Sequence, residues 1–137
     1  MLMELYKAKG FEPLFRSSPF LDTIGPIYQK TEGSKLQVGI EILEKHLNGR
    51  GFVHAGVWMT LADIAMGYSL VFAQQGEAAN WVTINQNTDF AGTARLGDWV
   101  EIEVDILKIG KQVAFVNAFF WKDNQRIVRV NAVFNAL

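Results

Sequence analysis

Residues 46–63 read HLNGRGFVHAGVWMTLAD, a polar turn marked by glycines that runs directly into an apolar segment containing one acid, Asp63. The apolar segment continues to residue 73 and has the length of a long α-helix. Because it is apolar on all faces, such a helix must be covered by protein or lipid on every side. A carboxylate loses solvation on burial, so Asp63 is either a structural hydrogen-bond acceptor or part of a functional site.

The composition predicts one domain over residues 1–137, with residues 1–24 as a helical cover at the N-terminus. Thirteen basic and fourteen acidic residues leave a net charge of −1, so no overall field favours nucleic acid or an anionic membrane. The chain has no cysteine, which excludes disulfides, thiolate metal ligands and cysteine nucleophiles. The N-terminal residues lack the apolar run of a secretory signal, so we expect a cytoplasmic protein.

The apolar content of the chain predicts a subunit interface. Half of the residues are hydrophobic and 12% are aromatic, which is more than one small core hides. Residues 53–73 are also long enough to span a membrane, but Asp63 near the middle would make insertion costly. We therefore expect a homodimer or homotetramer, with no membrane and no nucleic-acid partner.

Strand patterns lie on both sides of the apolar helix. A hairpin is predicted over residues 27–44, and the helix is expected to end near residues 74–76, where Gly76 supplies a stop. Four further strands are predicted as an antiparallel meander, at residues 81–90, 99–108, 112–122 and 126–136.

Two of these strands differ in pattern. Residues 100–106 alternate strictly between apolar and polar, which predicts one buried face. Residues 112–121 are apolar on both faces, which predicts a central strand covered on both sides. Together the elements predict an α+β fold in which about five or six antiparallel strands wrap one long helix.

The polar turn carries a family resemblance. The chain resembles the hotdog-fold acyl-CoA thioesterases, and most closely the phenylacetate-pathway type within the 4-hydroxybenzoyl-CoA thioesterase superfamily. That family has a His-x-Asn-x-x-Gly-x-x-His-Gly-Gly turn, followed by an Asp nine residues after the second His. The matching positions here are His46, Asn48, Gly51, His54, Gly56 and Asp63. The chain departs from the pattern at Ala55, where the family has glycine, and Thr83 keeps the hydroxyl that the family often has on the next strand.

Thioester hydrolysis needs hydrogen-bond donors for the carbonyl oxygen and a positioned base or nucleophile. A helix N-terminus presents free N–H groups, so the amides of Ala55 and Gly56 are the predicted oxyanion donors. Asn48 either fixes the loop, adds a donor or merely forms a turn. Asp63 lies about 12 Å further along the helix than Ala55. One thioester carbon cannot contact both positions, so a shared site requires two chains whose helices run antiparallel.

Roles follow for the remaining polar residues. Asp63 is expected to act as general base or nucleophile, and Thr83 to orient the water or hold Asp63. His54 either belongs to the site or caps the helix, and His46 is expected to be structural. A metal site formed by His46, His54 and Asp63 is not expected, because the helix holds Asp63 too far from His54 for shared coordination in one chain. No cofactor is expected.

These residues predict a thioesterase that hydrolyses an acyl-CoA to the free acid and CoA. The alternative is a non-catalytic protein that binds acyl-CoA or an acyl carrier, which Ala55 favours and Asp63 with Thr83 oppose. A hotdog hydratase would need a His and acid pair in another context, which the sequence lacks. The acyl chain stays open, because the large side chains near the site could line an acyl tunnel or belong to the core: Trp58, Met59, Met66, Trp81 and Phe90.

Overall fold

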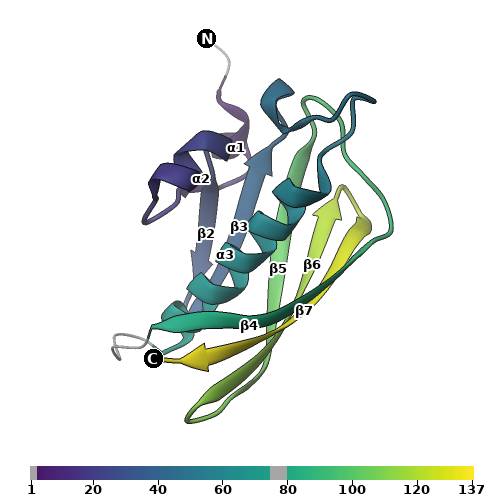
Figure 1. The fold of residues 1–137 in the computed structure, drawn as a ribbon. Coiled ribbons are helices and arrows are strands. Elements are labelled where there is room, and N and C mark those ends of the chain that lie inside the picture. Colours follow the sequence, from purple (N-terminus) through teal and green to yellow (C-terminus); the bar gives the residue numbers. More distant parts are fainter. Residues whose placement is uncertain (1–2, 75–79) are drawn as a thin grey trace.

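The computed structural model describes residues 3–74 and 80–137 and shows one long helix on a curved antiparallel sheet (Figure 1). The helices are α1 (Leu5–Ala8), α2 (Pro19–Ile24) and α3 (Ala55–Ala73), with a 3₁₀ turn η1 at Glu44–His46. The strands are β1 (Glu12–Pro13), β2 (Tyr28–Glu32), β3 (Lys35–Glu41), β4 (Trp81–Phe90), β5 (Trp99–Ile109), β6 (Val113–Lys122) and β7 (Gln125–Ala136).

The predicted fold class is confirmed, but the sheet has seven strands rather than five or six. The additional strand is β1, which lies inside the N-terminal segment that the sequence predicted to be helical. Its two residues pair with Gln29 and Tyr28 at the edge of the sheet. So short a strand has no alternating pattern, which is why the sequence gives no sign of it.

The predicted meander is wrong in one connection. The strand order is β1-β2-β3-β5-β6-β7-β4, so β3 pairs with β5, and β4 lies at the opposite edge beside β7. The helix α3 crosses the face of the sheet between β3 and β4, and so delivers the chain to that far edge (Figure 1). As a result β4 has one strand neighbour among the described residues.

The core forms where α3 packs into the curve of the sheet. The buried helix residues recur every three or four positions, as expected for one stripe of a helix: Trp58, Leu61, Ala62, Ala65, Met66, Ser69 and Leu70. The Trp58 ring meets the Phe120 ring edge to face, with centroids 5.3 Å apart. This stripe fixes both the position of α3 on the sheet and its rotation about its own axis.

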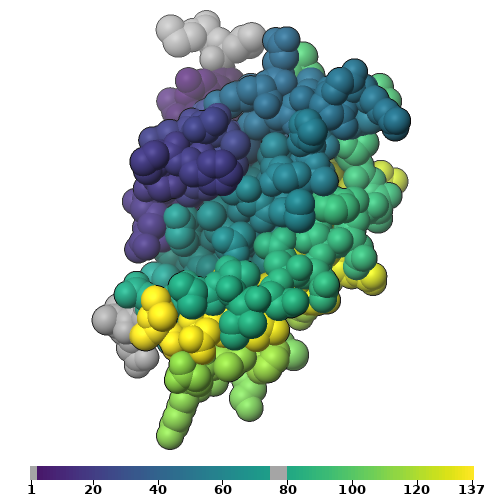
Figure 2. All heavy atoms as spheres, in the orientation of Figure 1, coloured from purple at the N-terminus to yellow at the C-terminus, as the bar shows by residue number. Residues whose placement is uncertain are grey.

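The expectation that α3 is covered on every side is not met within one chain. Met59 is 43% exposed, Gly56 is exposed and Asp63 is half-buried. Figure 2 shows part of α3 at the surface, between the N-terminal segment and β4. By length and composition α3 could cross a membrane, a property that the core helices of soluble proteins share. It ends at Ala73 with Gln74 as C-cap, and the predicted stop at Gly76 lies outside the described residues.

The two strand patterns have different outcomes. In β5, Val100, Ile102 and Val104 are buried, as the alternation predicted. In β6 only the face toward α3 is buried, and Phe115 on the other face is 42% exposed. The prediction that this strand is covered on both sides is therefore wrong for a single chain, because none of the described elements lies over the outer face there.

The N-terminal segment is held on the sheet and beside α3 by aromatic packing. The Phe11 and Trp99 rings meet edge to face over Gly39, with centroids 5.1 Å apart. A Cβ atom on Gly39 would collide with both rings, so this position requires glycine. Further along, the Phe15 ring packs edge to face on Tyr68 and Phe72 of α3, at 5.1 and 5.0 Å.

His46 fastens α2 to the loop that leads into α3. The imidazole is completely buried; its Nδ1 accepts the Leu43 N–H at 2.9 Å, which leaves Nε2 to donate to the Ile24 carbonyl at 2.6 Å. Burial lowers the pKa of His46 below its usual value, although the hydrogen bond to Ile24 opposes that shift. The ring is therefore a structural part of the fold, as the sequence predicted.

We expect the folded protein to lose stability as the pH falls below about 6.5, because the unfolded chain then binds a proton at His46 that the native state resists. The urea midpoint, measured between about pH 7.5 and 5.5, should fall in wild type. The midpoint should fall less in His46→Gln. In His54→Gln, which changes an exposed position, the midpoint should fall with pH as much as it does in wild type. Equal slopes in all three proteins would contradict this assignment.

Candidate active site

The loop before α3 is closed by backbone hydrogen bonds, so the helix begins at a fixed place. The His54 N–H donates to the His46 carbonyl at 2.9 Å, and the Asn48 N–H donates to the Phe52 carbonyl at 2.7 Å. His54 is the N-cap residue, and its carbonyl accepts the Val57 N–H at 3.0 Å. Its side chain is exposed and makes no capping hydrogen bond, so it is available to a ligand.

Asn48 organises the tip of this loop. Its Oδ1 accepts the backbone N–H groups of Arg50 at 2.8 Å and Phe52 at 3.2 Å. Gly51 completes the turn with a positive φ of 81°, a conformation that glycine adopts without strain. The Asn48 oxygen is thus occupied in holding the loop that positions the first residues of α3.

The first turn of α3 presents its amides to open space. The N–H groups of Ala55 and Gly56 have no partner one turn earlier in the helix, and both residues are exposed. A Cβ atom added to Gly56 would meet nothing within 4 Å. The aligned peptide dipoles of a helix of this length favour negative charge at that end, which suits a developing oxyanion.

Asp63 lies midway along α3, on the side that faces β4. The Thr83 hydroxyl donates to Asp63 Oδ1 at 2.5 Å, so β4 holds the carboxylate in place. Asp63 is half-buried rather than enclosed, which differs from the burial that the sequence suggested. The reason is that α3 is rotated so that its Trp58 stripe packs on the middle of the sheet at β6, whereas Asp63 points toward the edge strand β4.

The structure brings Asp63 and Thr83 together, but not Asp63 and the helix N-terminus. Ala55 and Asp63 lie on the same straight helix, about 12 Å apart along its axis. The two hollows that contain Asp63 are lined by neither Ala55 nor Gly56. One chain therefore holds the two halves of the predicted site separately.

Asp63 sits where two hollows meet. One, of about 290 Å³, is lined by Arg16, Asp63, Ile64, Gly67, Tyr68, Val71, Asn80, Trp81, Thr83 and Phe134. The other, of about 490 Å³, is lined by Ser18, Phe20, Leu21, Met59, Thr60, Asp63, Ile64, Tyr68 and Gln86. Of the large side chains considered from sequence, Met59 and Trp81 line these hollows, whereas Trp58 and Met66 are core residues and Phe90 is exposed.

Sequence reasoning missed several residues beside Asp63. Gly67 and Val71 follow Asp63 by four and eight positions, so helical periodicity alone could have placed them on its face. Arg16 had no such signal, because it reaches the hollow from the N-terminal segment through the packing of Phe15 on α3.

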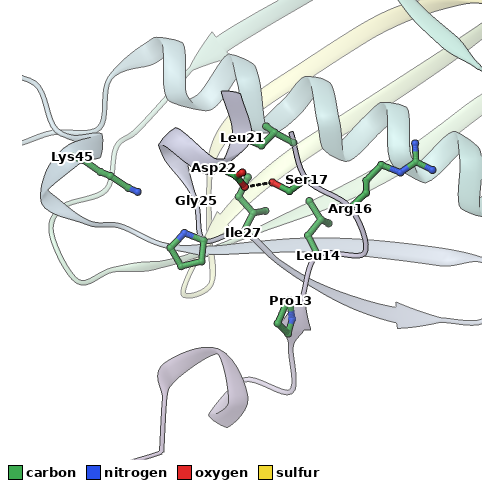
Figure 3. Close-up of a pocket in the computed structure, with 10 residues that line it drawn as sticks. Pro13, Leu14, Arg16, Ser17, Leu21, Asp22, Gly25, Ile27 and Lys45 are labelled. Atoms are coloured by element: carbon green, nitrogen blue, oxygen red, sulfur yellow. Dashed lines mark hydrogen bonds between the residues drawn. The ribbon is translucent and has the colours of Figure 1, made fainter. Parts of the chain in front are cut away.

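A third hollow, of about 470 Å³, lies between the N-terminal segment and η1 (Figure 3). Its walls include Leu14, Leu21 and Ile27, and the Ser17 hydroxyl donates to Asp22 at 2.6 Å beside them. Arg16 lines both this hollow and the smaller one at Asp63. None of the residues predicted to act in catalysis lines the third hollow.

Residues 3–74 and 80–137 contain no cluster of side chains that could bind a metal ion. No three histidine, aspartate or glutamate side chains come together there in a way that could hold an ion. Of the three side chains considered from sequence, His46 is buried with both ring nitrogens engaged.

Comparison with known proteins shows what the chain is similar to. It is 38% identical over 128 residues to the Pseudomonas aeruginosa protein named "Putative esterase PA0474", which covers 93% of this chain and 95% of that protein. It is 31% identical over 83 residues to mouse acyl-coenzyme A thioesterase 13, covering 61% of this chain and 58% of that enzyme.

Structural comparison agrees on the fold. The smu.793 protein of Streptococcus mutans, solved bound to acetyl CoA, superposes with a TM-score of 0.73 at 21% identity, over 80% of this chain and 86% of that one. The helix wrapped by an antiparallel sheet is thus the hotdog thioesterase fold. The family model described as the thioesterase superfamily matches residues 50–129, which is more than half of the chain. The chain belongs to the thioesterase superfamily.

Proposed function

We propose that the protein is an acyl-CoA thioesterase that hydrolyses an acyl-CoA to the free acid and CoA. The observation that carries this proposal is the Asp63–Thr83 pair, where a carboxylate is held by a hydroxyl at the junction of two hollows. Mouse acyl-coenzyme A thioesterase 13 and the acetyl-CoA complex of the S. mutans protein support the substrate class.

The proposed site is shared between two subunits. The strand β4 is an open edge of ten residues, on which Val82 and Ile84 are 42% and 57% exposed. Proteins rarely leave so long an apolar edge uncovered, and a second copy paired along β4 would cover it. Twofold pairing there also runs the two α3 helices antiparallel, so that Asp63 of each chain approaches the α3 N-terminus of the other.

The chemistry divides between the two subunits. The Ala55 and Gly56 N–H groups of one chain donate hydrogen bonds to the thioester carbonyl oxygen and stabilise the negative charge that develops on it. Asp63 of the other chain either removes a proton from the attacking water or attacks the carbonyl carbon itself. In both routes the carbon–sulfur bond breaks and CoA leaves as the thiol after protonation, by the proton taken from water in the first route and by a proton from solvent in the second. In the second route the acyl group is left on Asp63 as an anhydride, and a water molecule then hydrolyses it to the free acid and restores the carboxylate. Thr83 keeps the carboxylate aimed at the carbonyl carbon.

Three finer features are proposed with this activity. The motif around His46 and His54 favours the phenylacetate-pathway type. A dimer, alone or paired into a tetramer, is the expected assembly, and the cytoplasm is the expected compartment. Release of free CoA from short-chain, long-chain and aromatic acyl-CoAs tests the activity and identifies the acyl class.

Replacing Asp63 by asparagine should abolish most of the activity while leaving the fold intact. The Asp63→Asn side chain has nearly the same size and can still accept from Thr83, but it is neither a base nor a nucleophile, so kcat should fall about 10² or more. Asp105→Asn, at an exposed carboxylate on β5, is the matched control and should keep wild-type kcat. A folded Asp63→Asn protein with wild-type turnover would exclude the role assigned here, and acyl-CoA binding without turnover in wild type would favour the non-catalytic alternative.

Replacing Ala55 by proline should remove one oxyanion donor without disturbing the helix. Proline is favoured at the first helical position, and His54 already has the extended conformation (φ −61°, ψ 137°) that proline imposes on its predecessor. We expect Ala55→Pro to keep the wild-type melting temperature and to lose about 10² in kcat. Ala55→Gly keeps the N–H group and should stay active, so equal activity in the two variants would show that this amide does not bind the carbonyl.

A further inference from the structure

Arg16 places a positive charge on the wall of the hollow that contains Asp63. Its guanidinium carbon lies 4.7 Å from the Phe15 ring centroid and 5.4 Å from that of Tyr68. Figure 3 shows the side chain extending away from Leu14 toward the ribbon of α3. The cation therefore faces the helix that carries Asp63, and it is supported by two aromatic rings.

The backbone beside Arg16 is anchored in the fold. The Phe15 N–H donates to Gln29 Oε1 at 2.9 Å, and Gln29 is 6% exposed. The Gln29 amide in turn donates to Glu12 at 3.0 Å. Arg16 itself is exposed, and these contacts, with the packing of the Phe15 ring on Tyr68, hold its backbone beside the hollow.

The charge of Arg16 is not neutralised within the described part of the chain. The ion pairs found there join Lys7 to Glu4, Lys122 to Asp98 and Arg129 to Asp89. Asp63 is the one acid among the residues that line the hollow, and its Oδ1 already accepts from Thr83. Because a guanidinium presents five donors in a fixed fork, it is suited to a carboxylate brought by a ligand.

The remaining walls of the hollow suit an acyl chain. Ile64, Val71 and Phe134 are apolar, and Trp81 is oriented by donating its indole N–H to Gln74 at 2.9 Å. The volume of about 290 Å³ is at the lower end of the range for ligand pockets, so it fits an acyl group rather than a whole acyl-CoA. Asn80 adds a polar group to the lining.

We propose that this hollow is the acyl pocket and that Arg16 selects acyl groups with a carboxylate at the far end, as in dicarboxylic acyl-CoAs. This inference rests on the proposed thioesterase function. A carboxylate only a few bonds beyond the thioester reaches Arg16, which shares the hollow with Asp63. The phosphates of CoA are also anionic, but the pantetheine arm carries them far from the thioester carbon.

The test compares glutaryl-CoA with pentanoyl-CoA, which have the same chain length and differ in the terminal carboxylate. Wild type should have the higher kcat/KM for glutaryl-CoA. Arg16→Met should lower that value about tenfold or more and change pentanoyl-CoA turnover by less than about twofold. Arg16→Lys carries a point charge instead of the forked guanidinium, so its kcat/KM for glutaryl-CoA should lie between those of wild type and Arg16→Met. Arg126→Met is the matched control, because Arg126 is also exposed and packs on two aromatic rings but does not line the hollow, and it should behave as wild type.

An equal loss on both substrates would overturn the proposal, since Arg16 would then contact CoA or only support the fold. A wild-type preference for pentanoyl-CoA would overturn it as well. If wild type hydrolysed neither substrate, the thioesterase function itself would fail. Calorimetric binding of both compounds to Asp63→Asn, with and without Arg16→Met, then tests the selectivity separately, because only loss of the glutaryl-CoA preference on removing Arg16 supports it.

Discussion

The packing of one stripe of α3 into the curved sheet is the interaction on which the rest of the structure depends. Burial of Trp58, Leu61 and Met66 sets the rotation of the helix about its axis. That rotation turns Asp63 toward β4, where the Thr83 hydroxyl donates a hydrogen bond to it. The sheet curvature and the length of α3 also carry β4 to the far edge, beside β7. The core thus decides where the carboxylate lies, although Asp63 itself is not a core residue.

The same helix separates the two groups that hydrolysis needs. The free amides at Ala55 and the carboxylate at Asp63 are held about 12 Å apart by a rigid element, so one chain cannot bring them together. The strand β4 and the uncovered face of α3 lie next to each other on the face of the molecule that Figure 2 shows. A single feature, an apolar helix with only one stripe buried, therefore underlies both the proposed dimer and the proposed shared site.

Much of this could be predicted from sequence, because it depends on local patterns. Alternation located β5, helical length located α3, and the spacing from His46 to Asp63 indicated the family. The position of β4 at the far edge could not be predicted from the sequence, because the strand that β4 pairs with depends on how α3 crosses the sheet. Arg16 was missed for a related reason: a charged residue in a segment without periodicity gives no sign of the cavity to which tertiary packing brings it.

The central claim is that each site takes Asp63 from one chain and the α3 N-terminus from the other. It is tested most directly by mixing the two inactive variants Asp63→Asn and Ala55→Pro and allowing their subunits to exchange. Half of the dimers are then mixed, and each mixed dimer has one site with both groups intact, so about a quarter of wild-type activity should return. If native mass spectrometry shows mixed dimers while the mixture stays as inactive as its parents, the site is not shared and the account is wrong.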